Sequence, residues 1–159
     1  MLAAIVPPLL AADARRVGLL LGRGSKAFGR ALADKHPYLK ERIQVSGELS
    51  ASALAAHLAA CDLLLQPYPD GISSRRTSAM SGLALGRPMV TTQGDLTEII
   101  WQETAAVALA PANSPELIMA EAEALLADAG RRIELGHRAA ALYEQRFSWS
   151  RTVRTLRDQ

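Results

Sequence analysis

The sequence predicts an α/β fold in which a parallel sheet carries helices on both faces. Short runs that are apolar almost throughout, such as residues 17–21 (VGLLL) and 63–66 (LLLQ), alternate with helix-length segments. Strands of this kind belong to parallel sheets that are covered on both faces. The 159 residues contain no internal repeat and no long linker, so we expect one domain over residues 1–159.

The individual elements follow from their length and from the residues that bound them. Strands are expected in the short apolar runs, at residues 17–21, 43–46, 63–66, 89–92 and 107–109. Helices are expected at residues 25–36, 50–61, 73–85 and 96–101, and from residue 115 on with breaks near Gly130 and Ser148. Gly86 and Pro88 end the helix at residues 73–85, and Pro7 and Pro8 are expected to break any long helix at the start.

The composition is that of a globular protein, and the charge excludes two classes of partner. Eighteen basic and 16 acidic side chains give a net charge of +2, which is too balanced to indicate a nucleic acid or an anionic membrane as partner. No apolar run approaches the roughly 20 residues of a membrane-spanning helix. The single cysteine, Cys61, lies in an apolar helical stretch, so we expect a buried thiol in a reducing, cytoplasmic compartment.

Four loops follow predicted strands, and they hold most of the glycines and small polar residues of the first hundred positions. In open parallel sheets, ligands bind beyond the carboxyl ends of the strands. The candidate ligand loops are therefore residues 22–25, 46–50, 66–74 and 91–95.

The third of these loops leads into a helix with an unusual first turn. The turn at Asp70 and Gly71 is followed, after a serine cap, by Arg75 and Arg76. Because the start of a helix carries partial positive charge, a cation there is misplaced by about 0.3–1 kcal/mol. A bound phosphate or diphosphate would make both arginines favourable, and Gly71 would let it approach the backbone. The alternative is that both arginines point into water and that Asp70 is only a turn residue.

The order and spacing of the motifs resemble those of one enzyme family. The chain contains LLLGRGS, IQVSGELSASALAAHLAACDLLLQPYPDG, MSGLALGRPMVTTQGDLTEII and FSWSRTVRTL. Over residues 17–156 it is similar to the C-terminal, donor-binding lobe of the group 1 family of retaining glycosyltransferases, which have the two-lobed GT-B fold. The resemblance implies a Rossmann-like lobe without the family's first strand and helix. It also implies that residues 148–159 form a crossover-type helix, which we expect Phe147 and Trp149 to anchor and which exposes an apolar patch where the other lobe is absent.

The resemblance implies roles for individual residues. Asp70 takes the place of the first glutamate of the family's acidic pair, which contacts the donor sugar or its phosphate, and Ser78 takes the place of the second, which grips the ribose. The catalytic residues implied are Asp70, Arg75 and Arg76. The donor-binding residues implied are Gly22, Gly24, Gly47, Glu48, Gly71, Ile72, Ser73, Ser74, Ser78, Gly94 and Glu98.

Within the donor-binding set the resemblance separates three tasks. Residues 72–74 supply backbone N–H groups to the sugar and the diphosphate, and Gly47 and Glu48 lie where the family holds the base. Gly22 and Gly24 line the same cleft. For Glu98 two interpretations stay open, since it either touches the ligand or orients a loop or caps a helix.

Two departures from the family pattern affect these roles. Ser78 is not a carboxylate, so the usual grip on two ribose hydroxyls is weakened or replaced. The arginine and lysine that the family carries on its first strand and helix have no match, and Arg75 and Arg76 are candidates to replace them. The missing segment and the acceptor-binding N-terminal lobe are expected to lie upstream in a longer parent protein.

The function implied is the transfer of a sugar from a UDP- or GDP-linked donor to an acceptor hydroxyl with retention of configuration. Cationic side chains, N–H groups and a helix dipole stabilise the leaving diphosphate, so neither a metal nor another cofactor is implied. The chain alone is expected to bind the donor weakly and to be inactive, and peripheral membrane contact would come through the missing lobe.

Two other functions stay open at this point. A degenerate, non-catalytic lobe that serves as a scaffold or interaction module would explain the serine at position 78. A sugar-nucleotide epimerase of the same fold would need catalytic carboxylates and a histidine in the cleft, whereas His36, His57 and His137 are isolated in the sequence.

Overall fold

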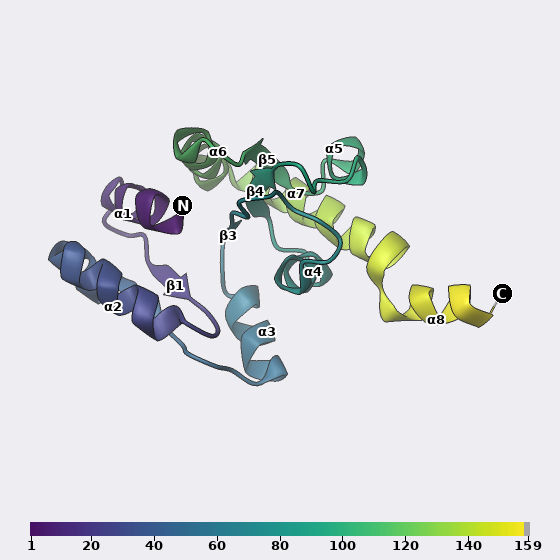
Figure 1. Cartoon of the computed structure of the whole chain (residues 1–159), viewed down its shortest axis with the longest axis horizontal. Coiled ribbons are helices and arrows are strands. Elements are labelled where there is room, and N and C mark those ends of the chain that lie inside the picture. Colours follow the sequence, from purple (N-terminus) through teal and green to yellow (C-terminus); the bar gives the residue numbers. More distant parts are fainter. Residues whose placement is uncertain (158–159) are drawn as a thin grey trace. The chain divides into compact units, whose positions relative to one another are not determined.

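The computed structural model describes residues 1–157, with only the backbone of Thr152, and the chain forms two compact units. Unit 1 is Met1–His57 and unit 2 is Leu58–Gln159. Both units contain parallel strands connected through helices, which confirms the predicted α/β class (Figure 1). The expectation of one domain over residues 1–159 stays a prediction, and residues 158–159 of the predicted last helix lie outside the described range.

Unit 1 is built on two short parallel strands. β1 (Gly18–Leu20) pairs with β2 (Ile43–Val45), with Gly18 opposite Ile43. Its helical elements are α1 (Leu2–Ala11), α2 (Ser25–Lys35), the 3-10 helix η1 (Pro37–Arg42) and α3 (Ala51–Ala59), whose last two residues lie beyond the unit boundary. The strands and helices predicted between residues 17 and 61 are thus confirmed within two residues at each end.

Pro7 and Pro8 lie inside α1 and do not interrupt it. A proline removes one helical N–H and crowds the preceding turn. In unit 1 the end of this helix gains other donors, because the guanidiniums of Arg16 and Arg42 donate to the carbonyl oxygens of Leu9 and Leu10 at 2.7 and 2.6 Å. These bonds satisfy helix-end carbonyls and offset the loss, so a ten-residue helix forms where we expected a break.

Unit 2 is built on three parallel strands in the order β3-β4-β5. β3 (Leu64–Gln66) and β5 (Ala108–Pro111) flank β4 (Met89–Gln93), as predicted from the apolar runs. The first four residues of β4 are buried, which fits a strand covered on both faces. The register places Leu64 opposite Met89 and Val90 opposite Ala108.

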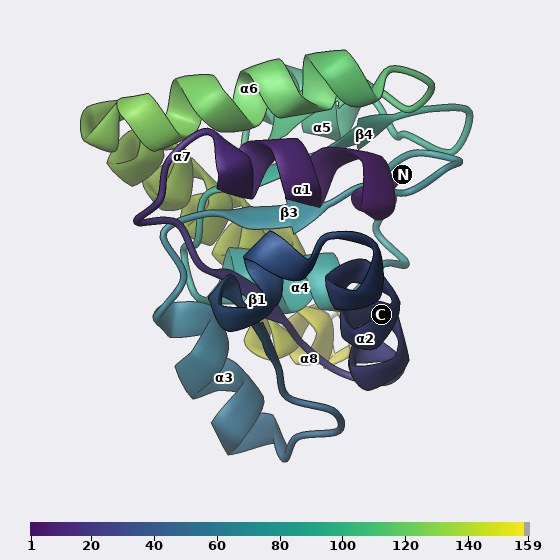
Figure 2. The same ribbon diagram turned by 90° about the vertical axis from the view of Figure 1, so that its left-hand side faces the viewer.

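Unit 2 carries several helical elements besides the sheet. They are α4 (Thr77–Ala84), α5 (Ile100–Thr104), α6 (Pro115–Ala127), α7 (Ala129–Leu142), the π-helical turn η2 (Tyr143–Phe147) and α8 (Trp149–Arg157). Figures 1 and 2 show α6 and α4 on opposite sides of the strands. The breaks predicted near Gly130 and Ser148 are confirmed, since Asp128 separates α6 from α7 and Ser148 separates η2 from α8. No helix in the described part of the chain is long and apolar enough to cross a membrane.

Two helices of unit 2 begin later than predicted. α4 starts at Thr77 instead of Ser73, with Arg76 in the N-cap position, and α5 starts at Ile100 instead of Leu96. Arg75 and Arg76 therefore precede the helix, and the prediction that they occupy its first turn is wrong. The physical cause is tertiary contact, which holds residues 71–76 as a loop and is described below.

The C-terminal aromatic residues behave differently from one another. Phe147 stacks on Trp101, with ring centroids 5.9 Å apart and planes inclined by 17°. Trp149 follows the break at Ser148 and is 79% exposed, so the expectation that it anchors the last helix is wrong. Leu156 is also exposed, and the apolar patch expected on this helix stays a prediction.

Cys61 lies just beyond α3 and is half-buried. The expectation of a buried thiol is therefore met only in part. Burial raises the pKa of this thiol above its usual range, so it is protonated at neutral pH.

Candidate functional site

In unit 2 the loops that follow β3 and β4 lie against each other. The N–H of Ile72 donates to the carbonyl oxygen of Thr92 at 2.8 Å, and the N–H of Tyr68 donates to the Thr92 hydroxyl at 2.7 Å. The N–H of Leu96 donates to the Asp70 carbonyl oxygen at 2.9 Å. Two of the candidate ligand loops, residues 66–74 and 91–95, thus follow neighbouring parallel strands and contact each other.

The closest approach between these loops is at Gly71 and Gly94. Gly71 has a φ of +88°, and a Cβ there would lie 2.3 Å from the Thr97 hydroxyl oxygen and 2.5 Å from the Gly94 nitrogen. A Cβ on Gly94 would lie 2.8 Å from the Gly71 nitrogen. Both positions therefore require glycine for loop packing. A direct contact of either residue with a ligand stays a prediction.

Arg76 is held by two neighbours from the loop after β3. Its guanidinium forms an ion pair with the Asp70 carboxylate, and its central carbon lies 4.7 Å from the centroid of the Tyr68 ring. Only 31% of the Arg76 side chain is exposed, and its Nε is buried without a hydrogen-bond partner in the described part of the chain. The charge of Arg76 is thus met by Asp70, and the side chain braces the loop.

Tyr68 also contacts the residue that replaces the family's second glutamate. The hydroxyls of Tyr68 and Ser78 are 2.8 Å apart, and the Tyr68 hydroxyl donates to Gln66 Oε1 at 2.7 Å. Burial raises the pKa of Tyr68, and this effect exceeds the lowering by the Ser78 hydrogen bond and by the Arg76 charge. Tyr68 and Gln66 lie in the predicted loop 66–74, but only the fold reveals their contact with Ser78.

Arg75 differs from Arg76 in its surroundings. It is exposed, and within residues 1–157 it makes no ion pair. The N–H groups of Ile72, Ser74 and Arg76 donate to acceptors in the protein, whereas those of Ser73 and Arg75 have no acceptor among the described residues. Ser73 is only 6% exposed, and an unpaired N–H in such surroundings costs free energy. Among the described residues, no side chain caps the start of α4.

The Glu98 carboxylate accepts hydrogen bonds from two segments of unit 2. It accepts the Ser74 N–H at 3.0 and 3.1 Å, the Ser74 hydroxyl at 2.6 Å and the indole N–H of Trp101 at 2.7 Å. Burial raises the pKa of Glu98, but the hydrogen bonds from Ser74 and Trp101 outweigh this effect and leave the pKa below its usual value. Glu98 therefore bonds to the loop at Ser74, and both interpretations drawn from the sequence, ligand contact and orientation of the loop, stay predictions.

The remaining predicted site residues form a second group, in unit 1. The Gly22 N–H donates to the Gly47 carbonyl oxygen at 3.1 Å, and the Gly47 N–H donates to the buried Ser25 hydroxyl at 2.9 Å. Loops 22–25 and 46–50 thus contact each other. Gly24 has a φ of +83° with open space around it. Glu48 pairs with Arg23 at 3.2 Å, and both side chains are exposed. Ser25 was not singled out from the sequence, although it starts the helix after the glycines.

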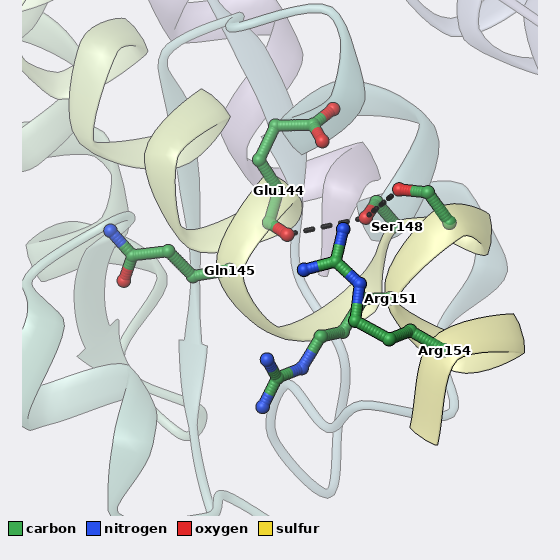
Figure 3. A pocket seen from close by; sticks show the side chains of 6 residues that line it. Glu144, Gln145, Ser148, Arg151 and Arg154 are labelled. Atoms are coloured by element: carbon green, nitrogen blue, oxygen red, sulfur yellow. Dashed lines mark hydrogen bonds between the residues drawn. The ribbon is translucent and has the colours of Figure 1, made fainter. Parts of the chain in front are cut away.

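A hollow outside these loops lies between η2 and α8 (Figure 3). It is lined by Glu144, Gln145, Ser148, Ser150, Arg151 and Arg154. None of these residues belongs to the predicted site. No group of three or more histidine, cysteine, aspartate or glutamate side chains in the described chain could hold a metal ion.

Comparison with known proteins supplies the context for this geometry. The family model described as "Glycosyl transferases group 1" matches residues 1–128. The match includes the first 16 residues, which lie ahead of the region where the motifs are recognisable. Among curated proteins, nothing matches the sequence.

Solved structures share the fold of this chain, among them the three that follow. Sucrose-phosphate synthase from Thermosynechococcus elongatus has a TM-score of 0.77 at 16% identity, over 98% of this chain and 40% of that one. Alr3699/HepE from Anabaena, in complex with UDP, has a TM-score of 0.68 at 18% identity, over 98% and 44%. The C-terminal domain of the group 1 protein LpcC from Francisella tularensis has a TM-score of 0.72 at 16% identity, over 92% and 76%. The chain therefore spans less than half of the length of the first two proteins. The structural similarity confirms the predicted Rossmann-like lobe of the GT-B fold.

Proposed function

Because this chain belongs to the group 1 glycosyltransferases, we propose that it is the donor-binding part of a retaining enzyme and that its unit 2 binds the diphosphate of a nucleotide sugar. The observation that carries the proposal is the pair of N–H groups without acceptors, on Ser73 and Arg75, beside an exposed arginine that makes no ion pair in the described chain. Phosphate oxygens bind to N–H groups and guanidiniums of this kind. The UDP in the HepE structure supports a nucleotide ligand.

The two arginines take different roles in this proposal. Arg75 donates to the diphosphate, while Arg76 holds Asp70 and stacks on Tyr68. As the bond between sugar and diphosphate breaks, negative charge grows on the phosphate oxygens, and Arg75 and the Ser73 N–H stabilise it. Asp70 keeps 44% of its side chain exposed, so it can also accept hydrogen bonds from sugar hydroxyls.

The nucleoside would meet different partners from those usual in the family. Ser78 presents a hydroxyl bonded to Tyr68 where the family presents a carboxylate. Two neutral hydroxyls grip a ribose less strongly than an ionised acid, because charge-assisted hydrogen bonds are the stronger ones. The assignment of Gly22, Gly24, Gly47 and Glu48 to the nucleotide stays part of the proposal. The acceptor hydroxyl and its lobe would come from outside this chain.

Calorimetric titration of the 159-residue chain with UDP and with GDP tests this function. We expect Arg75→Ala to weaken binding of the preferred nucleotide by about 10- to 150-fold, the equivalent of about 1.5–3 kcal/mol for a hydrogen bond to a charged group. The unfolding temperature should not change, because Arg75 is exposed.

Arg30→Ala is the matched control, since Arg30 is an exposed arginine on α2. It should bind the nucleotide as the wild-type chain does. Absence of nucleotide binding by the wild-type chain, or unchanged binding by Arg75→Ala, would contradict the proposal and favour the scaffold or interaction module.

A further inference from the structure

We propose that Glu98 is a positioning residue that presents the phosphate loop, residues 72–76, and that it does not itself touch the donor. This inference rests on the proposed function. Its first support is the number of donors that the carboxylate already accepts: the Ser74 N–H, the Ser74 hydroxyl and the Trp101 indole N–H, at 2.6–3.1 Å. A carboxylate engaged by three donors has little capacity left for a ligand.

The second support is electrostatic. A free carboxylate beside a diphosphate would repel it, and the repulsion would be strong in a partly dry site. Glu98 is half-buried, and its negative charge is met by Ser74 and Trp101. The carboxylate oxygens therefore bond to donors of the protein, and these bonds stabilise the charge that remains beside the phosphate loop.

The third support is the pattern of N–H groups in the phosphate loop. Glu98 takes the N–H of Ser74, and the two flanking N–H groups, on Ser73 and Arg75, are those without acceptors in the described chain. The bond from the Ser74 N–H to Glu98, together with the bonds from the Ile72 and Arg76 N–H groups, narrows the φ and ψ angles open to the peptides between them. Preorganised donors of this kind need no rearrangement when the ligand arrives.

Glu98 is also bonded to a rigid part of unit 2, the buried side chain of Trp101. Trp101, which donates to Glu98, is fully buried and stacks on Phe147. Glu98 thus connects the phosphate loop to the core of unit 2. A side chain with this placement acts on the ligand through Ser74.

The test compares UDP with inorganic pyrophosphate as ligands of the full 159-residue chain, by calorimetry. We expect Glu98→Ala to lower the affinity for both ligands by the same factor, about tenfold, because the loop that holds the diphosphate is loosened. If Glu98 instead contacted the nucleoside, its loss would weaken UDP and leave pyrophosphate unaffected. That result would overturn the inference.

Three further variants separate positioning from a general effect on stability. Glu98→Gln keeps the side-chain shape and should lose less affinity than Glu98→Ala. The glutamine variant also gives a readout if the alanine variant does not fold. Trp101→Phe removes the indole donor but leaves both Ser74 bonds, so it should lower the unfolding temperature yet cost less affinity than Glu98→Ala. Glu103→Gln, at an exposed carboxylate on α5, should bind as wild type does.

The possible failures are distinguishable. Wild-type chain that binds neither UDP nor pyrophosphate would end the proposed function and this inference with it. Wild-type binding together with unchanged affinity in both Glu98 variants would end the inference alone. A third outcome is that the loss of affinity follows the loss of unfolding temperature in all three variants, Glu98→Ala, Glu98→Gln and Trp101→Phe. The role of Glu98 would then be purely structural, and the inference would be overturned.

Discussion

Trp101→Ala is expected to lower the free energy of unfolding by about 3–5 kcal/mol, the range for large-to-alanine changes of buried aromatic residues. Trp101 is fully buried in unit 2. Its loss removes the stack on Phe147, opens a cavity and takes away a donor to Glu98. Urea denaturation followed by circular dichroism measures the change.

Trp149→Ala is the matched control, because the same chemical change is made at a side chain that is 79% exposed. It should alter the free energy of unfolding by no more than about 0.5 kcal/mol. Equal losses in the two variants would mean that Trp149 also packs into the core, as the sequence had indicated. That outcome would contradict the arrangement of the C-terminal segment described above.

Gly71→Ala is the second change with a large expected effect. The φ of +88° costs a residue with a Cβ about 1–2 kcal/mol. The added carbon would also lie 2.3 Å from the Thr97 hydroxyl oxygen and 2.5 Å from the Gly94 nitrogen, and overpacking adds about 1–3 kcal/mol. We therefore expect a loss of about 2–5 kcal/mol in the free energy of unfolding, measured as for Trp101.

Gly22→Ala separates the conformational cost of a positive φ from the cost of overpacking. Gly22 has the same φ of +88°, but no atom of the described chain that counts as a contact lies within 4 Å of the position of its Cβ. Its loss should stay near the conformational cost of about 1–2 kcal/mol. If both variants lost the same amount, the close packing of Gly71 against the loop after β4 would be refuted.

The sheet was predictable from the sequence because its signal is local. The run at residues 63–66 is apolar apart from Gln66, and the run at residues 89–92 is bounded by Pro88 and followed by Gly94. Each becomes a parallel strand within one residue of the predicted bounds. Burial on both faces leaves this pattern in the sequence itself.

The start of α4 was not predictable, because it depends on contacts between distant residues. Ser73 and Ser74 have the chemistry of helix caps, which favours a start at residue 73. In the fold Ser74 is held by Glu98, 24 residues away, and Ile72 is held by Thr92. These tertiary bonds outweigh the local capping preference and delay the helix to Thr77.

The candidate site was predictable at the level of loops and less so at the level of partners. From the sequence, Asp70 is expected in the loop after the strand and Arg76 in the first turn of the next helix, where it either binds phosphate or points into water. The fold pairs Arg76 with Asp70 and stacks it on Tyr68, which leaves Arg75 as the exposed cation. Side-chain pairing of this kind depends on the path of the loop, which no local pattern encodes.

Backbone amide chemical shifts measured during a titration with UDP test the central claim most directly. The account predicts that the N–H signals of Ser73 and Arg75 shift most in unit 2, while that of Ser74, already bonded to Glu98, shifts less. The opposite result is saturable UDP binding in which the largest amide shift changes of unit 2 lie elsewhere, for example at Ser148 and Arg151 beside η2 and α8. That result would contradict the claim that residues 72–76 bind the diphosphate.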